Sequence, residues 1–485
     1  MEGSRSRVRG AVHSGLLTGI STAAVSGSAA ILGVILSRKF GHGVKTDGFF
    51  AAYGVYLGLV LVAGSLRVVV LPRFAAAREE GRLAHEVGTW SVGIAVPLAV
   101  VLLVAEAWPH PLADALTSSP TARDQAAQLL PWIVPSAVAQ IFGGLVASAL
   151  AAYDDYISAA FGFAAGSVAG VVATLALVGH GTVAFGWGLA LNGVLSLAIP
   201  LVPLVARGGV GLPDASPWHR LLELGEGVAL PLALQALYVI AYRFASGLGA
   251  GRATTFSYAY LIAAFLVAVT AGSGALVATV PFAREGSSPV RAARHVAAIS
   301  WLSLALVVAA AGVFALAGGS IVVRVLGSSY GGSIGAELGR LVVYFVPWMV
   351  ASVALTVAFP LVFVRGRARW LPVLAVVAVL AHVLIEWGAS AAFGLAGLAG
   401  GIGLTTGLVL LVLLWWLGAL GLALRPILVA SLTCGLIGLA AYALPRLVVG
   451  PVAAAAAGLF VYLAFLALWR PPGLRQAWAY MRALQ

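Results

Sequence analysis

The chain has 485 residues, of which 61% are hydrophobic and only 9% are charged, and its mean hydropathy is +1.04. In a soluble domain about a quarter of all residues are charged and cover the surface, so this composition excludes a soluble protein. The net charge of +12 is spread over short loops and is nearly all arginine, a distribution that disfavours a nucleic-acid partner and is typical of membrane orientation.

Apolar stretches long enough to cross a bilayer follow one another along almost the whole chain. A helix needs about 20 apolar residues to span the hydrocarbon layer. The apolar runs are continuous rather than alternating, which predicts helices and not the strands of a barrel. We therefore predict an all-α integral membrane protein with about 14 transmembrane helices. The predicted spans are 11–37, 47–71, 87–107, 126–152, 157–178, 184–206, 225–246, 254–281, 295–318, 338–364, 370–388, 394–417, 427–445 and 448–469.

The first span begins after a basic segment that resembles the start of a signal peptide. The apolar stretch 11–37 is too long for a signal core of about 7–15 residues, so we interpret it as an uncleaved span. The single cysteine, Cys434, lies inside an apolar run, which predicts a buried and unreactive thiol.

Basic residues in the loops predict the orientation of the chain. With the N-terminus in the cytoplasm, eighteen lysines and arginines fall on the inner side and eight on the outer side. The positive-inside rule then predicts an even number of spans, with both termini in the cytoplasm. The first outer loop, RKFGHGVK, is basic and departs from this pattern, either because it has a function or because it only flanks two helices.

Spans two and eight resemble each other, which indicates an internal repeat. The second opens with TDGFFAAY and exits with VLPRFAAAREEG, and the eighth opens with TTFSYAY and exits with TVPFAREG. Thr46 and Pro72 are separated by the same number of residues as Thr255 and Pro281. Six spans lie between the copies, so both face the same way, as in a parallel repeat of a secondary transporter.

The repeat predicts two lobes of six helices each, followed by two additional helices. The predicted parts are an N-lobe at 1–206, a cytoplasmic linker at 207–224, a C-lobe at 225–424, and two extra spans with a cytoplasmic tail at 425–485. Small residues four apart, at Gly166/Gly170, Gly247/Gly251 and Gly397/Gly401, predict close approaches between helices.

Three segments carry a resemblance to a known family. FGHGVKTDGFFAAY at 40–53, LLPWIVPSAVAQIFGGLVASALAAYDDY at 129–156 and LPLALQALYVIAYRFASGLGAGRATTFSYAY at 230–260 resemble the MurJ/MviN lipid II flippases of the multidrug/oligosaccharidyl-lipid/polysaccharide exporter superfamily. The matching positions in the last segment are Gln235, Phe244, Ala245, Ser246, Gly251, Tyr258 and Ala259. The resemblance implies two lobes that open a central cavity alternately to each side. The implied cargo is a polyprenyl-pyrophosphate-linked sugar.

The chain departs from that family where its members carry cavity arginines in the first, second and eighth spans. The residues at these places are Ser26, Leu32, Val60, Tyr260, Leu261 and Ala264. Two other arginines do lie within predicted spans, Arg67 toward the inner end of span two and Arg243 in the outer half of span seven. A charge at the bilayer centre costs about 2.5–3.5 kcal/mol, so each is a candidate for binding the pyrophosphate, although Arg67 is also able to snorkel.

Other polar residues in the spans have both a structural and a functional interpretation. We favour Asp47 as the N-cap of the second span, with a place in the cavity as the alternative. Gln235 and, by resemblance, Tyr258 are cavity candidates, although for Gln235 we favour a hydrogen bond between helices. His382 and Glu386 share one helical face; we favour a position near the outer interface over a proton relay.

The sequence contains no HExxH, Walker or His/Cys metal-ligand motif, so we predict neither an enzyme, a metal site nor a cofactor. We predict a transporter for lipid II or a related lipid-linked glycan in the bacterial cytoplasmic membrane. Its predicted partners are the lipid-linked saccharide, membrane lipids and a coupling ion, H⁺ or Na⁺, with no nucleic acid. The alternatives are a drug/cation antiporter of the same superfamily and a non-transporting scaffold for wall synthesis.

Overall fold

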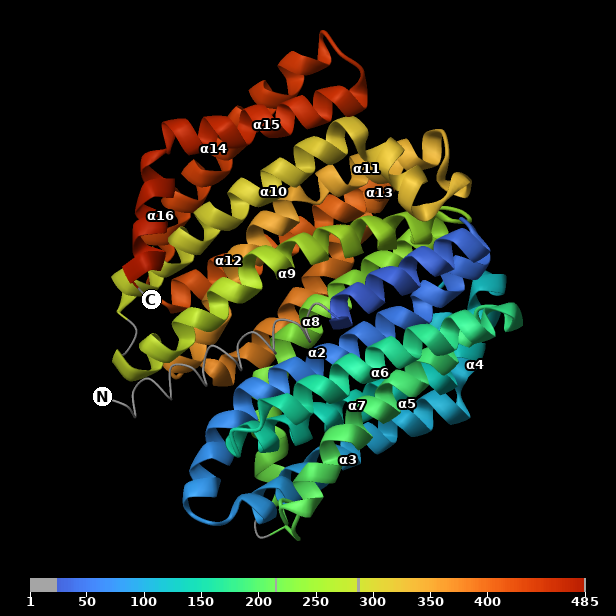
Figure 1. Cartoon of the computed structure of the whole chain (residues 1–485), viewed down its shortest axis with the longest axis vertical. Coiled ribbons are helices and arrows are strands. Elements are labelled where there is room, and N and C mark those ends of the chain that lie inside the picture. The colour runs from blue at the N-terminus through green and yellow to red at the C-terminus, as the bar shows by residue number, and fades with distance from the viewer. Residues whose placement is uncertain (1–23, 214–215, 286–287, 484–485) are drawn as a thin grey trace. The chain divides into compact units, whose positions relative to one another are not determined.

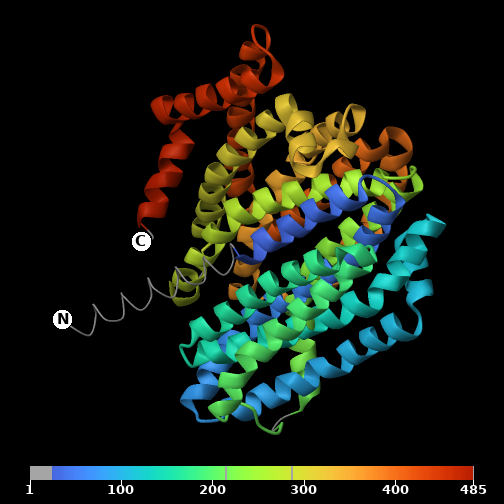
Figure 2. The ribbon, with the colours of Figure 1, turned by 45° about the vertical axis from the view of Figure 1, so that its right-hand side comes forward.

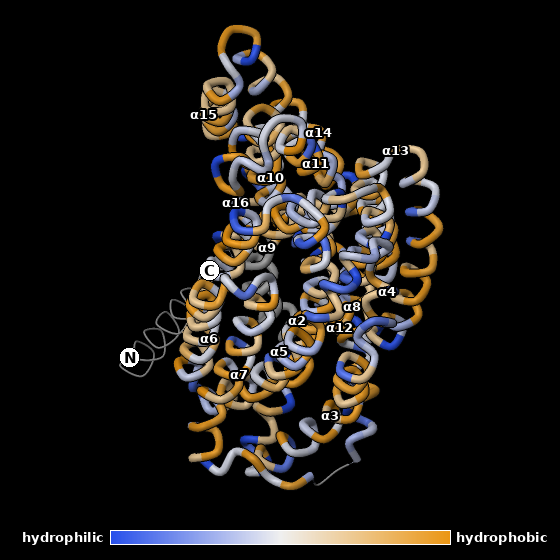
Figure 3. Tube along the Cα trace, turned by 90° about the vertical axis from the view of Figure 1, so that its right-hand side faces the viewer, coloured by the Kyte–Doolittle hydropathy of each residue, from blue (hydrophilic) through white to orange (hydrophobic). Residues whose placement is uncertain are grey.

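The computed structural model describes residues 24–213, 216–285 and 288–483, and within these ranges the chain is helical with no strand, as predicted (Figure 1). Hydrophobic residues run along the bodies of the helices, and most hydrophilic residues lie at their ends and in the connections (Figure 3). A chain in hydrocarbon has no water to satisfy its backbone, so continuous helices are the structure that this composition requires.

Residues 24–40 form the described part of the first helix, and the helices that follow keep their numbers from Figure 1. They are α2 (Val44–Glu79), α3 (Leu83–Ala107), α4 (Pro109–Leu116), α5 (Pro120–Ala152), α6 (Tyr156–Leu177), α7 (Val183–Ala206), α8 (Pro217–Gly247), α9 (Arg252–Glu285), α10 (Pro289–Leu326), α11 (Ser333–Tyr344), α12 (Val346–Val364), α13 (Leu371–Trp416), α14 (Leu420–Arg446), α15 (Pro451–Trp469) and α16 (Pro472–Ala483).

Helix starts follow from local chemistry. Pro120, Pro289 and Pro451 each lie in the first turn of a long helix. The N–H groups of this turn make no hydrogen bond within the helix, so the N–H that proline lacks is not needed there. Two starts are also capped by side chains. The Asp155 carboxylate accepts a hydrogen bond from the Ser158 N–H (3.0 Å), and Ser288 accepts one at the start of α10.

Among the described residues, twelve helices are long and apolar enough to cross a membrane. One of them, α13, has 46 residues and contains a non-helical residue, Gly394 (φ 57°, ψ −134°). His382 and Thr405 would be about 35 Å apart in a straight helix, yet their side chains are 2.9 Å apart, so the chain reverses at Gly394. Thus α13 is a hairpin of two spans, and together with the first span, of which only the part from residue 24 is described, the count agrees with about 14.

The chain divides into two compact units, unit 1 up to Val239 and unit 2 from Ile240. In unit 1 the long helix α5 packs against α2, α3 and α7, and α6 packs against α7. Gly166 and Gly170 of α6 lie so close to α7 that an added Cβ would meet the backbone of Asn192 or Gly188, which confirms one of the predicted small-residue contacts.

Unit 2 repeats the order of helices and the helix contacts of unit 1. Each unit has two long helices, a short helix (α4 or α11) and then three further spans. The contacts of α5 with α2, α3 and α7 correspond to those of α12 with α9, α10 and α13. The similarity between spans two and eight therefore extends over a whole set of helices.

Helices α14, α15 and α16 come after this repeated set and pack against α10 (Figure 2). Cys434 of α14 is fully buried in this contact, beside Trp301 and Leu304 of α10, as predicted for an unreactive thiol. The Tyr442 hydroxyl donates a hydrogen bond to the Ala309 carbonyl (2.7 Å), which satisfies its polar end inside an apolar contact.

Three local predictions were wrong. The predicted span 338–364 is interrupted at Phe345: α11 ends there, and Pro347, which lacks an N–H to bond to the carbonyl four residues earlier, lies in the first turn of α12. The predicted span 225–246 begins earlier than expected, because α8 starts at Pro217. Gly251 lies in the turn between α8 and α9 with a positive φ, so the Gly247/Gly251 pair marks a turn and not a helix contact.

The reversal at Gly394 predicts a specific sensitivity. A Cβ at this position meets nothing within 4 Å, so Gly394→Ala tests backbone strain alone. Because only glycine adopts this φ/ψ pair at low cost, we expect a loss of about 1–3 kcal/mol in stability. Thermal unfolding in detergent micelles measures it. Gly400→Ala is the matched control, since Gly400 is helical and also unobstructed, and a comparable loss there would contradict the assignment.

Candidate functional site

The five residues predicted for the cargo site fall in both units. Asp47, Arg67 and Gln235 belong to unit 1, whereas Arg243 and Tyr258 belong to unit 2.

Asp47 is not the N-cap of α2. The cap residue is Gly43, which has no side chain, and Asp47 lies in the first turn with its N–H bonded to the Gly43 carbonyl (3.0 Å). The residue is 3% exposed. A negative charge in the first turn is favoured by the helix dipole, so Asp47 stabilises the start of α2 from inside the helix.

Arg67 has an exposed side chain on α2. Its neighbour Leu66 and the nearby Val70 are fully buried in the core of unit 1. Positions three apart share a helix face, so Arg67 lies at the edge of the face that Val70 buries, and its side chain extends from there to the exposed surface of α2.

Gln235 is buried against α2, where it lies in contact with Gly58. Its Nε2 has no hydrogen-bond partner among the described residues. The neighbouring polar groups are paired, since Gln140 Nε2 donates to the Tyr56 hydroxyl (2.7 Å), and Tyr56 stacks on Tyr53 (5.4 Å between ring centres). Buried amide donors are rarely left unpaired, so Gln235 offers one donor to a ligand or a water molecule.

Arg243 and Tyr258 occupy different environments in unit 2. Arg243 is half-buried on α8, between the buried residues Tyr242 and Ala245. Tyr258 is buried on α9, and its ring packs edge-on against that of Tyr330 (5.7 Å between ring centres). Of these two, only Arg243 keeps partial exposure.

A more strongly buried polar cluster lies inside the α13 hairpin. His382 and Glu386 are both 0% exposed, and His382 Nε2 lies 3.3 Å from Glu386 Oε1. Gly401 of the returning helix leaves the space that the carboxyl group occupies, because a Cβ there would lie 2.7 Å from Glu386 Oε1. The sequence predicted separate spans at 370–388 and 394–417 and showed that His382 and Glu386 share a face, but it did not predict that Gly401 and Thr405 lie against them.

The hydrogen bonds of this cluster assign one proton. Thr405 donates its hydroxyl hydrogen to the Gly401 carbonyl (3.0 Å), so its oxygen accepts from His382 Nδ1–H (2.9 Å). The second ring nitrogen of His382 then faces Glu386 Oε1, and two lone pairs would repel each other unless a proton lay between them. Neither Glu386 oxygen accepts any hydrogen bond within the described residues, so the shared proton is the means of neutralising this buried pair.

A second set of charged side chains, partly buried, lies in unit 1, where α8 begins. Glu86 of α3 is 5% exposed, pairs with Arg220 of α8 (2.9 Å), and accepts a hydrogen bond from Trp90 Nε1 (3.0 Å). Glu223 pairs with Arg73 of α2 (2.6 Å). These pairs join three helices at one end of unit 1, and the sequence alone did not predict them.

The turn between α5 and α6 gathers further arginines. Arg78 pairs with Asp154 (2.8 Å) and Arg207 pairs with Asp155 (2.7 Å), and both guanidinium groups lie over the ring of Tyr153. Partial burial acts to raise the pKa of Asp155, but the hydrogen bonds from Ser158 and the charge of Arg207 outweigh it, so the pKa is lowered. Part of the predicted positive charge of this side is thus neutralised locally.

No group of three or more His, Cys, Asp or Glu side chains able to hold a metal ion occurs in the part of the chain that the structure describes. No protein-family model and no curated protein sequence matches the chain.

Solved structures do match the chain, and transporters are among them. The chain is similar to a multidrug resistance MATE family transporter of the MOP superfamily in an inward-facing conformation, with a TM-score of 0.63 and 14% identity over 84% of this chain and 95% of that one. It is also similar to a MOP superfamily transporter from Pyrococcus furiosus, with a TM-score of 0.57 and 15% identity over 85% and 94% of the two chains. The chain therefore has the helical fold of this transporter superfamily.

Similarity to one member is more extensive. The lipid II flippase MurJ in its inward closed conformation matches with a TM-score of 0.74 and 13% identity, over 94% of this chain and 98% of that one. At this level of identity the match establishes the fold.

The Glu86–Arg220 pair predicts a large loss on removal of one partner. Arg220→Ala leaves the buried Glu86 carboxylate without its cation, so we expect a loss of about 3 kcal/mol in thermal or denaturant unfolding in micelles. The double variant Arg220→Ala/Glu86→Gln should recover part of it. Glu80→Gln, which breaks the exposed pair with Arg82, is the control and should cost under about 1 kcal/mol. Equal losses at both pairs would contradict the burial argument.

Proposed function

We propose that this protein is a secondary transporter that moves a polyprenyl-pyrophosphate-linked saccharide across the bacterial cytoplasmic membrane by alternating access. The observation that carries the proposal is the extent of the fold match, which covers 94% of this chain and 98% of MurJ, described as a lipid II flippase. The repeated helix order and the additional α14 and α15 helices agree with it.

The chemistry of the cargo supports a role for arginine. A pyrophosphate needs cations or strong donors, and guanidinium groups supply both in a fixed geometry. Arg67 and Arg243 lie within membrane-spanning helices and keep exposed or partly exposed side chains. We infer that they bind the pyrophosphate in place of the cavity arginines that this chain lacks, with the Gln235 amide as an additional donor. Asp47 and Tyr258 act in positioning their helices.

Arg67→Ala and Arg243→Ala test this proposal in cells depleted of the native protein. A charge-assisted hydrogen bond contributes about 1.5–3 kcal/mol, so each variant should lower transport by about 10–100-fold. The measurement is the lipid-linked saccharide that accumulates on the inner leaflet. Arg475→Ala, an exposed arginine of the short helix α16, is the control and should complement fully.

Two outcomes would contradict the proposal. If depletion causes no lipid-linked saccharide to accumulate, the cargo is wrong. If the double variant Arg67→Ala/Arg243→Ala supports normal growth and wall synthesis, a non-transporting scaffold becomes the better description.

A second candidate is a proton-coupled drug antiporter, and one observation bears on the driving ion of both candidates. The His382–Glu386 pair holds a titratable proton away from water, inside a hairpin of two spans, which is typical of proton relays in transporters. The same pair also supplies a coupling site for the lipid-linked cargo. The two candidates therefore differ in the cargo rather than in the driving ion.

Glu386→Gln tests the coupling role. The amide keeps the volume of the carboxyl group but cannot exchange a proton, so transport driven by a pH gradient in vesicles should fall at least about tenfold while downhill movement persists. Glu106→Gln, at an exposed position, is the control. An unchanged response to the pH gradient, or a response to a sodium gradient alone, would contradict proton coupling. Proton-dependent efflux of a cationic dye would favour the antiporter.

A further inference from the structure

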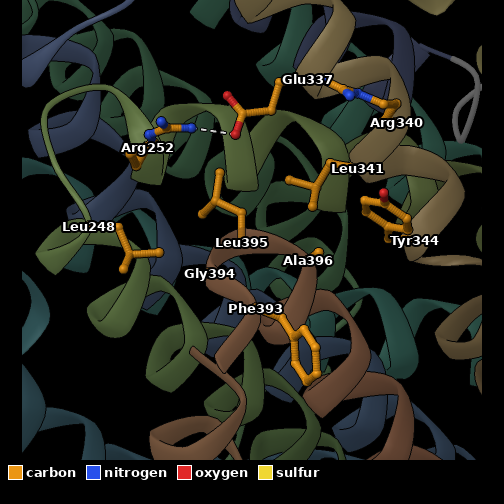
Figure 4. A pocket seen from close by; sticks show the side chains of 10 residues that line it. All are labelled: Leu248, Arg252, Glu337, Arg340, Leu341, Tyr344, Phe393, Gly394, Leu395 and Ala396. Carbon is orange, nitrogen blue, oxygen red and sulfur yellow. Dashed lines mark hydrogen bonds and ion pairs between the residues drawn. The ribbon is translucent and has the colours of Figure 1, made fainter. Parts of the chain in front are cut away.

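Unit 2 contains a cavity of about 390 Å³ at the end where α8 stops and α9 begins. Its wall is formed by the α8–α9 turn, by α11 and by the reversal of α13 at Gly394 (Figure 4). The volume falls within the range of small-molecule sites. By the predicted orientation, this end of unit 2 lies on the outer side of the membrane.

One side of the cavity is charged and has more arginine than acidic side chains. Arg252 at the start of α9 forms an ion pair with Glu337 of α11, and Figure 4 shows the two groups facing each other. Arg340, one turn further along α11, is exposed and forms no ion pair or side-chain hydrogen bond among the described residues. Glu337 is the single acid among the lining residues, so one positive charge remains unneutralised.

Two helices also begin at this cavity. α9 starts at Arg252, and the second half of α13 starts at Leu395, directly after the reversal. The first N–H groups of a helix have no partner within it and carry partial positive charge. Both helix starts therefore add to the attraction that the arginines exert on an anion.

The opposite side of the cavity is apolar and reaches the outside of the unit. It is lined by Leu248, Leu341 and Leu395, together with Phe393 and Tyr344, which are 74% and 49% exposed. Aromatic side chains with this exposure, close to charged groups, are typical of the interface between hydrocarbon and water. An inorganic ion would use only the cationic side of such a cavity.

We propose that this cavity binds the phosphate head group of an anionic lipid, whose apolar chain lies against Phe393 and Leu248. Arg340 binds the phosphate first, and Arg252 exchanges Glu337 for the phosphate. Neither Arg67 nor Arg243 lines this cavity, and the lipid proposed here is not the transported cargo.

Binding of short-chain lipids to the full-length protein in detergent tests the proposal. The probes are dihexanoyl phosphatidic acid, dihexanoyl phosphatidylcholine and inorganic phosphate, each titrated while bound lipid is measured by native mass spectrometry. We expect phosphatidic acid to bind at least about tenfold more tightly than either of the other two, with an affinity that falls as salt rises.

Variants separate a ligand site from a structural ion pair. Arg340→Ala should weaken phosphatidic acid binding by about tenfold or more, and Arg340→Lys should weaken it less. Glu337→Gln should tighten binding several-fold, because it frees Arg252 and removes a repelling charge. Phe393→Ser, at an exposed position, should weaken binding of the lipid but not of inorganic phosphate. Arg446→Ala, an arginine outside the cavity, should change nothing.

Three results would overturn the proposal. Equal binding of phosphatidic acid and phosphatidylcholine would exclude phosphate recognition, and equal binding of phosphatidic acid and inorganic phosphate would exclude the lipid. Weaker binding in the Glu337→Gln variant would show that the carboxylate holds the cavity together instead of competing with the ligand. Unfolding temperatures of all variants are measured in parallel, so that a loss of binding in a destabilised variant is not counted as support.

Discussion

The need to satisfy every backbone hydrogen bond inside the hydrocarbon layer governs this structure. It leaves helices as the only option for a chain of this composition. It also favours prolines in the first turn of a helix, as at Pro289 and Pro347, because a proline further along the helix removes a backbone hydrogen bond that neighbouring groups must replace. Where the chain reverses without a loop, as in α13, a glycine is required, because no other residue adopts that backbone conformation at low cost.

The same constraint explains how charges are accommodated. At the end of unit 1 where α8 begins, Glu86 and Arg220 are neutralised by pairing between helices, and Trp90 donates a further hydrogen bond to Glu86. In the α13 hairpin, the ring of His382 is the one basic group that faces Glu386 among the described residues, so neutrality depends on a proton. In the cavity beside α11, by contrast, a positive charge is left over. We interpret the first arrangement as an ion pair that stabilises the structure, the second as a site of proton exchange and the third as a ligand site.

The sequence was sufficient for the features that depend on one helix at a time. Apolar length predicted the spans, and the similarity of spans two and eight predicted the repeat, because both are read along the chain. The sequence was insufficient where the third dimension decides. Gly401 and Thr405 lie 15 and 19 positions beyond Glu386 but touch its cluster only because Gly394 reverses the chain. Likewise, Asp47 resembles a cap until the helix is seen to begin three residues earlier, at Val44.

The hairpin of α13 has a further consequence for how the chain enters the membrane. A span carrying His382 and Glu386 by itself would present two polar groups to lipid, which costs several kcal/mol on insertion scales. The companion span from Leu395 covers both groups and follows with no intervening loop. The two spans are therefore suited to leave the insertion machinery as one pair, with the polar cluster already enclosed when the lipid is first encountered.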